Sequence, residues 1–314
     1  MTDIHNLFKR LIIQGSSLEP VSVAVCHPCS EVSILGVVDA AKAGLIKPVL
    51  VGPLEKLKEI AKLARVDISE YRIISTEHSH ASAAKAVALC RNGECQALMK
   101  GSLHTDELMH EVMLRDSGLR TERRMSHVFI MVVPNYPRIL LITDAAININ
   151  PTLEEKVDIV QNAIDLAHVL DIPQPKVAIL SAVETVSSKI ASTIDAAALC
   201  KMADRQQITG GILDGPLALD NAINLEAAKI KGIVSPVAGK ADILVVPDLE
   251  SGNMLAKQLE YFANAKAAGI VLGARVPIIL TSRADSAATH LASCAVAVKY
   301  VHARMRDAAY KINT

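Results

Sequence analysis

The segment with the clearest chemical character is 280–286, in which Ser282, Arg283 and Asp285 follow the apolar run 276–280. In an α/β protein, an apolar strand that ends at polar side chains delivers them to the ligand-binding edge of the sheet. Arginine suits a phosphate there, because its planar guanidinium donates two charge-assisted hydrogen bonds to phosphate oxygens. The same pattern also fits an ordinary strand end with a serine cap and a solvated arginine. By itself the segment leaves both interpretations open.

Five other apolar runs end in the same way, with glycine, proline and polar side chains. Glycine lets a ligand approach the backbone closely, and a loop before a helix offers free amide donors to an anion. No single segment of this kind is specific, because glycine and aspartate at a strand end usually only turn the chain. The candidate ligand contacts in these runs are Lys100, Gly101, His104, Thr105, Asp144, Asn148, Ser235, Gly239, Lys240 and Asn253.

Together, these segments occur in the order found in the phosphate acetyltransferase and phosphate butyryltransferase family, which the chain resembles through nearly its whole length. The most specific stretches are 181–185, 214–218, 235–240 and 280–286. The chain is most similar to the butyryltransferase-like branch and to the transferase half of bifunctional enoyl-CoA hydratase/phosphate acetyltransferases. The resemblance implies a two-domain α/β fold like that of isocitrate and isopropylmalate dehydrogenases, with the site in an interdomain cleft. It also implies a homodimer formed through the second domain.

By this resemblance the protein moves a short-chain acyl group between coenzyme A and inorganic phosphate, by direct attack and without an acyl-enzyme. We expect Arg283 to bind the phosphate of the acyl phosphate and Ser282 to donate to the reacting group. Such donors lower the barrier because negative charge grows on the carbonyl oxygen and on the departing phosphate. Lys100, His104 and Thr105 match the family's glycine-threonine loop, which we expect around the phosphoryl oxygens. For Lys100, a salt-bridged lysine at a strand end is an equal alternative.

Two positions depart from the family's pattern. The aspartate that acetyltransferases carry seven positions after the motif serine, where it is proposed to take the thiol proton, is Thr289 here. Asp285 can substitute for it, or can equally cap the terminal helix. A thiol with a pKa near about 8.5 is already ionised in part at neutral pH, so a strong base is helpful rather than essential. In the glycine-threonine loop, the arginine that follows the paired leucines is replaced by His110.

A group of arginines follows that loop, at positions 115, 120, 123 and 124. These residues either take over the missing phosphate contact, meet the phosphates of coenzyme A, or form a solvated charged face.

The departures motivate an alternative, a sensor that binds coenzyme A or acyl phosphate without turnover. A decarboxylating dehydrogenase linked to NAD(P) is a second alternative, because one fold hosts many functions. Such an enzyme needs carboxylates around a divalent metal. The chain has no pair of aspartates four positions apart with matching basic residues, and no G-x-G-x-x-G follows a strand. We therefore expect no metal and no permanently bound cofactor, with coenzyme A as a substrate.

The composition is typical of an α/β enzyme that acts on small molecules. Lysine plus arginine and aspartate plus glutamate number 33 each, so no net field favours nucleic acid or an anionic membrane. The start of the chain lacks the pattern of a signal peptide, and no uncharged apolar run is long enough to span a membrane. Six cysteines are too few for a disulfide framework in a chain of 314 residues. We expect a cytoplasmic protein with reduced thiols and neither a nucleic-acid nor a membrane partner.

The elements that must position these residues alternate between short β-rich runs and alanine-rich helical segments, as in βαβ units. One pair of strands breaks the alternation. The runs 128–133 and 138–143 are separated only by Pro134 to Pro137, which indicates antiparallel strands at a domain junction. We expect domain I to comprise 1–126 and 270–314, and domain II, the dimerisation side, to comprise 127–269.

Overall fold

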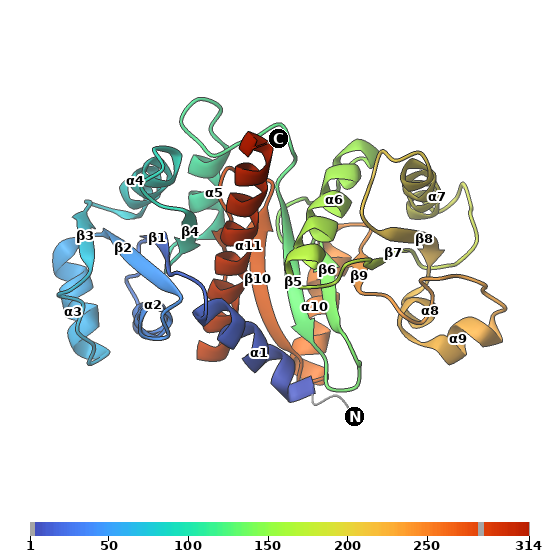
Figure 1. The fold of residues 1–314 in the computed structure, drawn as a ribbon, viewed down its shortest axis with the longest axis horizontal. Helices are drawn as coiled ribbons and strands as arrows, with labels where there is room; N and C mark the ends of the chain where they lie inside the picture. The colour runs from blue at the N-terminus through green and yellow to red at the C-terminus, as the bar shows by residue number, and fades with distance from the viewer. Residues whose placement is uncertain (1–3, 282–285, 314) are drawn as a thin grey trace. The chain divides into compact units, whose positions relative to one another are not determined.

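The computed structural model describes residues 4–281 and 286–313, and the side chains of residues 7–281 and 286–307. The chain forms two compact units, which we call unit 1 (Met1–Leu7 and Arg124–Ala267) and unit 2 (Phe8–Arg123 and Ala268–Thr314). Figure 1 shows their elements in chain order. Unit 2 is therefore built from both ends of the sequence.

Unit 2 holds a mixed sheet in the order β3-β2-β1-β4-β11-β10. All described pairings within it are parallel except that of β10 with β11. The strands are β1 (Val21–Cys26), β2 (Ile46–Gly52), β3 (Arg72–Ser75), β4 (Ala97–Lys100), β10 (Lys266–Leu272) and β11 (Ile278–Ile279). The helices are most of α1 (Ile4–Ser16), α2 (Glu31–Lys42), α3 (Leu54–Leu63), α4 (Ser79–Arg91), α5 (Thr105–Met113) and α11 (Ala287–Asn313). Five of the six residues of β1 are buried, as expected for a parallel strand that is covered on both faces.

Unit 1 holds a second set of strands in the order β5-β6-β9-β7-β8. The antiparallel pair predicted around Pro134 to Pro137 is confirmed, since β5 pairs antiparallel with β6 while the other described pairings of the unit are parallel. The strands are β5 (Ser126–Val132), β6 (Ile139–Thr143), β7 (Lys176–Leu180), β8 (Ile212–Leu217) and β9 (Ile243–Val245). The helices are α6 (Leu153–Val169), α7 (Ala191–Asp204), α8 (Leu219–Ile223), α9 (Leu225–Ile230) and α10 (Leu249–Phe262).

The structure differs from the sequence pattern in two helical regions. The apolar residues at 221–228 predict one helix, but α8 and α9 are separate, because the side chain of Asn224 accepts the amides of Glu226 and Ala227 and caps α9. Asparagine competes in this way with helical backbone bonds. The second difference is α5, which the sequence does not predict because its cap residue, His104, makes no side-chain hydrogen bond to the helix. A helix start without a capping bond lacks the usual sequence signal.

His127 in β5 is a buried titratable group of unit 1. Its imidazole is 1% exposed and packs edge-on against Phe129, with the ring centroids 4.4 Å apart. Burial lowers the pKa of His127 from 6.5 to about 3, because desolvation disfavours the imidazolium form. Between these two pH values the unfolded chain binds more protons than the folded chain, so stability must fall as the pH falls.

We expect acidification from pH 6.5 to pH 4.5 to remove about 2 kcal/mol of stability through His127, because each pH unit inside the window is worth up to about 1.4 kcal/mol. His127→Phe should lose this part of the pH dependence. Urea unfolding of both proteins at several pH values measures it, and the difference between them cancels the titration of other groups. An identical pH dependence in parent and variant would contradict the prediction.

Candidate active site

In unit 2, three adjacent parallel strands bring their carboxyl ends to one edge of the sheet. Lys100 ends β4, lies in register with Cys26 of β1, and is 7% exposed. The amide of Gly101 donates to the carbonyl of Cys26 at 2.8 Å. A Cβ atom at Gly101 would overlap that carbonyl, so the close approach of the two strand ends requires glycine. Thr281 follows β11, the next strand beside β4.

A small pocket lies at this edge, with a volume of about 20 Å³, which is room for about one water molecule. The Nζ atom of Lys100 donates to the carbonyl of Gly101 at 3.3 Å. The pocket is lined by Ser30, Val32, Ser33, Lys100, Gly101, Ser102, Thr281 and His290. The structure therefore brings Lys100 and Gly101 beside Thr281, the residue that precedes Ser282. Ser282, Arg283 and Asp285 themselves lie outside the described residues.

The residues after this segment begin α11. The hydroxyl of Ser286 accepts the amide of Thr289 at 3.2 Å and lies 3.2 Å from its hydroxyl. Thr289 is 7% exposed, and its carbonyl accepts the hydroxyl of Ser293. The position at which related acetyltransferases are expected to carry an aspartate is thus a buried residue in the first turn of the helix.

His104 and Thr105 lie at the start of α5, where His104 is the N-cap residue and is exposed while Thr105 is half-buried. His110 lies in the same helix and is exposed. The phosphate-binding role of His104 and Thr105 stays a prediction.

In unit 1, the loop after β6 is organised by one carboxylate. Asp144 is 3% exposed and accepts the amides of Ala146, Ile147 and Asn148 at 2.9 to 3.1 Å. It also accepts the side-chain amide of Asn148 at 2.6 Å. Burial raises the pKa of Asp144, and these four hydrogen bonds oppose that change because they favour the ionised form. With so many donors, the carboxylate holds the loop together.

Asn148 in turn orients an arginine, Arg124. Its Nδ2 atom also donates to the carbonyl of Met125 at 2.8 Å, and its Oδ1 atom accepts from Nε of Arg124 at 2.7 Å. Arg124 also pairs with Glu155 at 2.9 Å. The sequence places Arg124 only within a group of arginines, since neither partner is close to it in the chain. The structure singles it out as an arginine whose guanidinium has a fixed orientation.

Asn253 joins the same cluster, because its Nδ2 atom donates to the carbonyl of Ala145 at 3.3 Å. Asp248, which precedes it, caps α10 by accepting the amide of Ser251 at 2.8 Å. The structure thus brings Asp144, Asn148 and Asn253 together.

Ser235, Gly239 and Lys240 are not part of that cluster. They precede β9, whereas Asp144 follows β6, and β6 and β9 are parallel, so the two groups approach opposite ends of these strands. Ser235 accepts the amides of Val237 and Ala238 at 3.0 and 3.1 Å, which is a turn motif. Gly239 has a φ of 74°, which favours glycine. Local geometry thus gives Ser235 and Gly239 a role in turning the chain.

Comparison with known proteins agrees with the resemblance in the sequence. A model of the phosphate acetyl/butaryl transferase family matches residues 76–298. A phosphate acetyltransferase of Rhizobium meliloti is 62% identical over 301 residues, which are 96% of this chain and 95% of that protein. The chain belongs to the phosphate acetyl/butaryl transferase family. The predicted family and the predicted enzyme class are therefore confirmed.

Other members of the family are named after different acyl groups. A phosphate butyryltransferase of Clostridium acetobutylicum is 41% identical over 290 residues, covering 92% of this chain and 96% of that protein. A solved branched-chain phosphotransacylase of Enterococcus faecalis is 31% identical, with a TM-score of 0.79 and coverage of 90% of this chain and 99% of the other. These names span several acyl chains and do not select one.

The expected likeness to isocitrate and isopropylmalate dehydrogenases is wrong. The solved structures that match are phosphotransacylases and, more distantly, 4-hydroxythreonine-4-phosphate dehydrogenases. The one from Klebsiella pneumoniae has a TM-score of 0.54 at 11% identity, over 90% of this chain and 99% of the other. The alternation of strands and helices predicts an α/β class correctly, but strand order depends on long-range pairing that this pattern does not encode.

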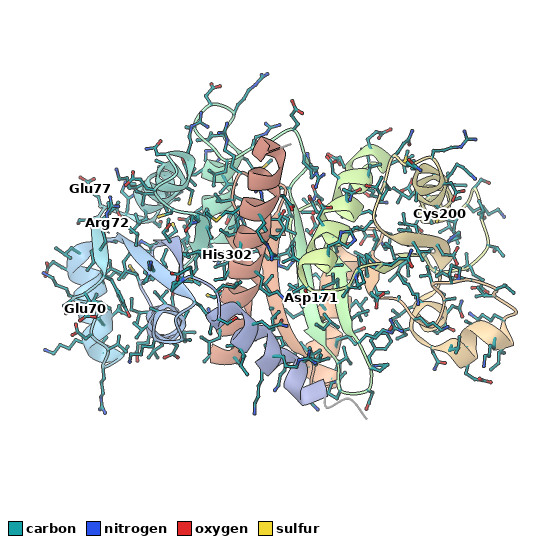
Figure 2. All side chains as sticks on the ribbon, viewed as in Figure 1. Glu70, Arg72, Glu77, Asp171, Cys200 and His302 are labelled. Carbon is teal, nitrogen blue, oxygen red and sulfur yellow. The ribbon has the colours of Figure 1, made fainter. Side chains whose placement is uncertain are left out.

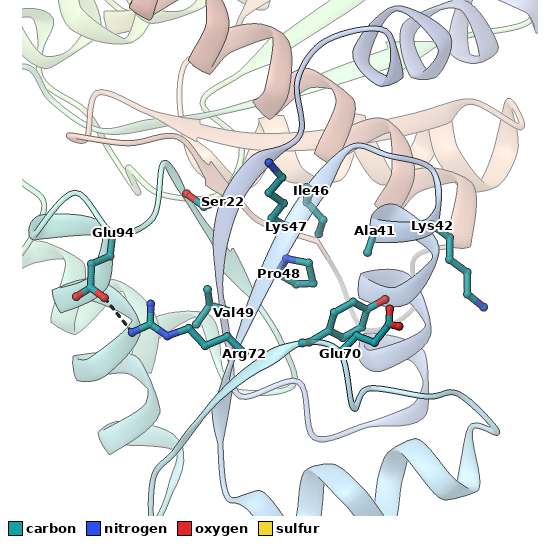
Figure 3. A pocket seen from close by; sticks show the side chains of 11 residues that line it. Ser22, Ala41, Lys42, Ile46, Lys47, Pro48, Val49, Glu70, Arg72 and Glu94 are labelled. Carbon is teal, nitrogen blue, oxygen red and sulfur yellow. Dashed lines mark hydrogen bonds and ion pairs between the residues drawn. The ribbon is translucent and has the colours of Figure 1, made fainter.

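A larger pocket, of about 610 Å³, lies at the other end of the unit 2 strands (Figure 3). It is lined by Ser22, Ala41, Lys42, Ile46, Lys47, Pro48, Val49, Glu70, Tyr71, Arg72 and Glu94. Arg72 is paired with Glu94 at 3.0 Å across it. Ser22, Ile46 and Arg72 lie at the amino ends of β1, β2 and β3, so this pocket is at the opposite edge from Lys100. None of the predicted site residues lines it.

The cysteines of this family member are all free thiols. Five are buried, and Cys200 of α7 is partly exposed (Figure 2). Burial raises the pKa of Cys200 to about 12 and that of Cys29 to about 11, so both stay protonated at neutral pH. Within residues 4–281 and 286–313, no three His, Cys, Asp or Glu side chains form a potential metal site. No helix in the same residues is long and apolar enough to cross a membrane.

Proposed function

We propose that this protein exchanges a short-chain acyl group between coenzyme A and inorganic phosphate: acyl-CoA + phosphate = acyl phosphate + CoA. The observation that carries the proposal is the 62% identity to a phosphate acetyltransferase across 96% of the chain. Coenzyme A acts as a substrate in this reaction and leaves with each turnover.

The acyl group passes directly from one substrate to the other. In the direction of acyl-CoA synthesis, the thiolate of coenzyme A attacks the carbonyl carbon of the acyl phosphate, and the bond from that carbon to the phosphate oxygen breaks. Arg283 binds the phosphate, and Ser282 donates to the reacting group. Lys100 supplies a second positive charge, and the amides at the start of α5 provide further donors. Such donors stabilise the charge that develops on the carbonyl oxygen and on the leaving phosphate.

Activation of the thiol needs no strong base. Thr289 is buried in the first turn of α11, so its hydroxyl does not replace a carboxylate. A thiol with a pKa near about 8.5 is already a few per cent ionised at neutral pH. Asp285 remains the candidate for any proton transfer, and its position lies outside the described residues.

In unit 1, the ordered loop after β6 holds the coenzyme. Asp144 fixes Asn148, and Asn148 orients Arg124. A guanidinium with a fixed orientation is suited to the phosphates of coenzyme A, because less side-chain entropy is lost when it binds. Asn253 offers its amide at the same loop. Ser235 and Gly239 shape the turn before β9, at the other end of the strands from this loop.

Release of free coenzyme A from acetyl-, propionyl- and butyryl-CoA, with and without inorganic phosphate, tests the proposal. Phosphate-dependent release is expected, and the rates rank the acyl chains. If no acyl-CoA releases coenzyme A while coenzyme A still binds, the protein is a sensor and not a transferase.

We further propose that units 2 and 1 act as domains I and II, and that unit 1 forms a homodimer through α10. Met254, Tyr261 and Phe262 of this helix are 60%, 68% and 88% exposed. Apolar residues gathered on one element mark an interaction surface more often than scattered ones do. Six free thiols favour a cytoplasmic location, where disulfides are rare.

Met254→Glu combined with Phe262→Glu should convert the dimer into monomers, because two charges would have to be buried at the contact. Sedimentation velocity measures the change in mass. Ile13→Glu is the control, since Ile13 is 67% exposed but lies on α1 of unit 2. A double variant that keeps the mass of the parent would overturn the choice of α10.

A further inference from the structure

His27 follows β1 in unit 2 and has a left-handed backbone, with a φ of 52°. Few residues other than glycine adopt this conformation, and it persists only where neighbouring contacts enforce it. Here the amide of His27 donates to the carbonyl of Val51 at 2.7 Å, which ties the residue to β2. Its own carbonyl accepts the amide of Cys29 at 2.8 Å.

The same carbonyl also holds the loop after β4. Both the amide and the hydroxyl of Ser102 donate to it, each at 2.9 Å. A Cβ atom at Gly101 would collide with the carbonyls of Cys26 and His27. The turn that carries Lys100, Gly101 and Ser102 is therefore fastened directly to the backbone of His27.

A chain of hydroxyl groups fixes the imidazole of His27. Its Nδ1 atom lies 3.1 Å from the hydroxyl of Ser82, a residue of α4 that is fully buried. The hydroxyl of Ser82 donates to the carbonyl of His78 at 2.9 Å, and it also lies 2.8 Å from the hydroxyl of Thr76. Nδ1 of His27 and the hydroxyl of Ser82 share one hydrogen bond, and either group can be its donor. The imidazole is thus tied to α4 in either tautomer.

We propose that His27 is a positioning residue for phosphate: its bond to Ser82 holds the left-handed backbone that presents its carbonyl to Ser102, and thereby sets the turn at Lys100 and Gly101. This inference rests on the proposed function, in which that turn contacts the phosphate. Nothing in the sequence marks the residue for this task, because Ser82 and Ser102 are 55 and 75 positions away.

Without the imidazole, the backbone of residue 27 relaxes toward the ordinary right-handed or extended regions, and the turn at Gly101 shifts. A misplacement of about 1 Å in a substrate-positioning group reduces catalysis by up to about 100-fold. Because the turn contacts phosphate and not the acyl chain, the effect should fall on one substrate only.

The test is the steady-state kinetics of His27→Ala and His27→Asn with acetyl-CoA and inorganic phosphate as the two varied substrates. For His27→Ala we expect the KM for phosphate to rise about 10-fold or more, and the KM for acetyl-CoA to stay within about twofold. His27→Asn should restore most of the loss, because asparagine tolerates the left-handed conformation and its side-chain amide offers both a donor and an acceptor near the place of Nδ1. Ser82→Ala should change the KM for phosphate in the same direction as His27→Ala.

The matched control is His302→Asn. A ring nitrogen of His302 is hydrogen-bonded as well, in this case to the carbonyl of Glu19, and His302 lies on α11 toward the amino end of β1 (Figure 2). Circular dichroism and melting temperature confirm that each variant is folded. A parent without phosphate-dependent release of coenzyme A would overturn the proposed function. An active parent whose His27→Ala variant keeps the parental KM for phosphate, or raises both KM values equally, would overturn the role of His27.

Discussion

Arg283→Ala is expected to lower phosphate-dependent release of coenzyme A by roughly 1,000-fold, because a preorganised donor at a developing charge is worth about 10² to 10³ in kcat. The loss should be at the upper end of that range, since a guanidinium in the proposed role would supply both a charge and two parallel hydrogen bonds. Thioester cleavage is followed with a thiol-reactive dye, at saturating acyl-CoA and varied phosphate.

One further variant separates the charge of Arg283 from its geometry, and a second serves as the control. Arg283→Lys keeps the charge but loses the planar fork, so it should recover only part of the activity. Arg205→Ala is the control, because Arg205 is an exposed arginine that ends α7 and has no assigned role. An Arg283→Ala protein with more than a tenth of the parental rate would remove Arg283 from the phosphate site.

Asp144→Ala is expected to reduce the free energy of unfolding by about 3 kcal/mol and to abolish activity. The substitution leaves the amides of Ala146, Ile147 and Asn148 and one side-chain amide without their acceptor in a buried loop. Each buried donor that is left without its acceptor costs about 1 to 3 kcal/mol, and Asn148 would no longer hold Arg124. Urea unfolding followed by circular dichroism measures the change.

The comparison variants for this prediction are Asp144→Asn and Asp248→Ala. Asparagine keeps one acceptor oxygen for the amides of Ala146 and Ile147, so its effect should be smaller. Asp248 only caps α10, and loss of a cap costs about 1 kcal/mol. If Asp144→Ala is no more destabilising than Asp248→Ala, the buried loop is not held by this carboxylate.

Much of the local structure could be predicted because it depends on short-range patterns. The Pro134 to Pro137 break between β5 and β6 is visible in the sequence, and the antiparallel pair that it predicts is confirmed. Helix boundaries were harder to predict where one polar side chain decides them. Asn224 divides α8 from α9 by capping, and no periodicity in the apolar residues signals it.

Long-range pairing decided the rest of the fold. Strand β11 contributes only Ile278 and Ile279, yet it pairs with β4 and β10, which lie far from each other in the chain. Such pairings follow from the fit of packed surfaces, and a sequence pattern with a period of two residues does not specify the partner of a strand. The expected likeness to isocitrate dehydrogenases came from the family resemblance, and the solved structures that match contradict it.

The sequence by itself determined the family and the chemistry of its polar loops, because residue types such as arginine, lysine and glycine restrict what a loop can bind. Only the tertiary structure decided how these loops are held. It fastened the Gly101 turn to His27, gave Arg124 a fixed orientation through Asn148, and placed Lys240 at the other end of the strands from Asp144. Hydrogen bonds between residues distant in the chain act only after folding has closed the intervening loops, and local sequence carries no record of them.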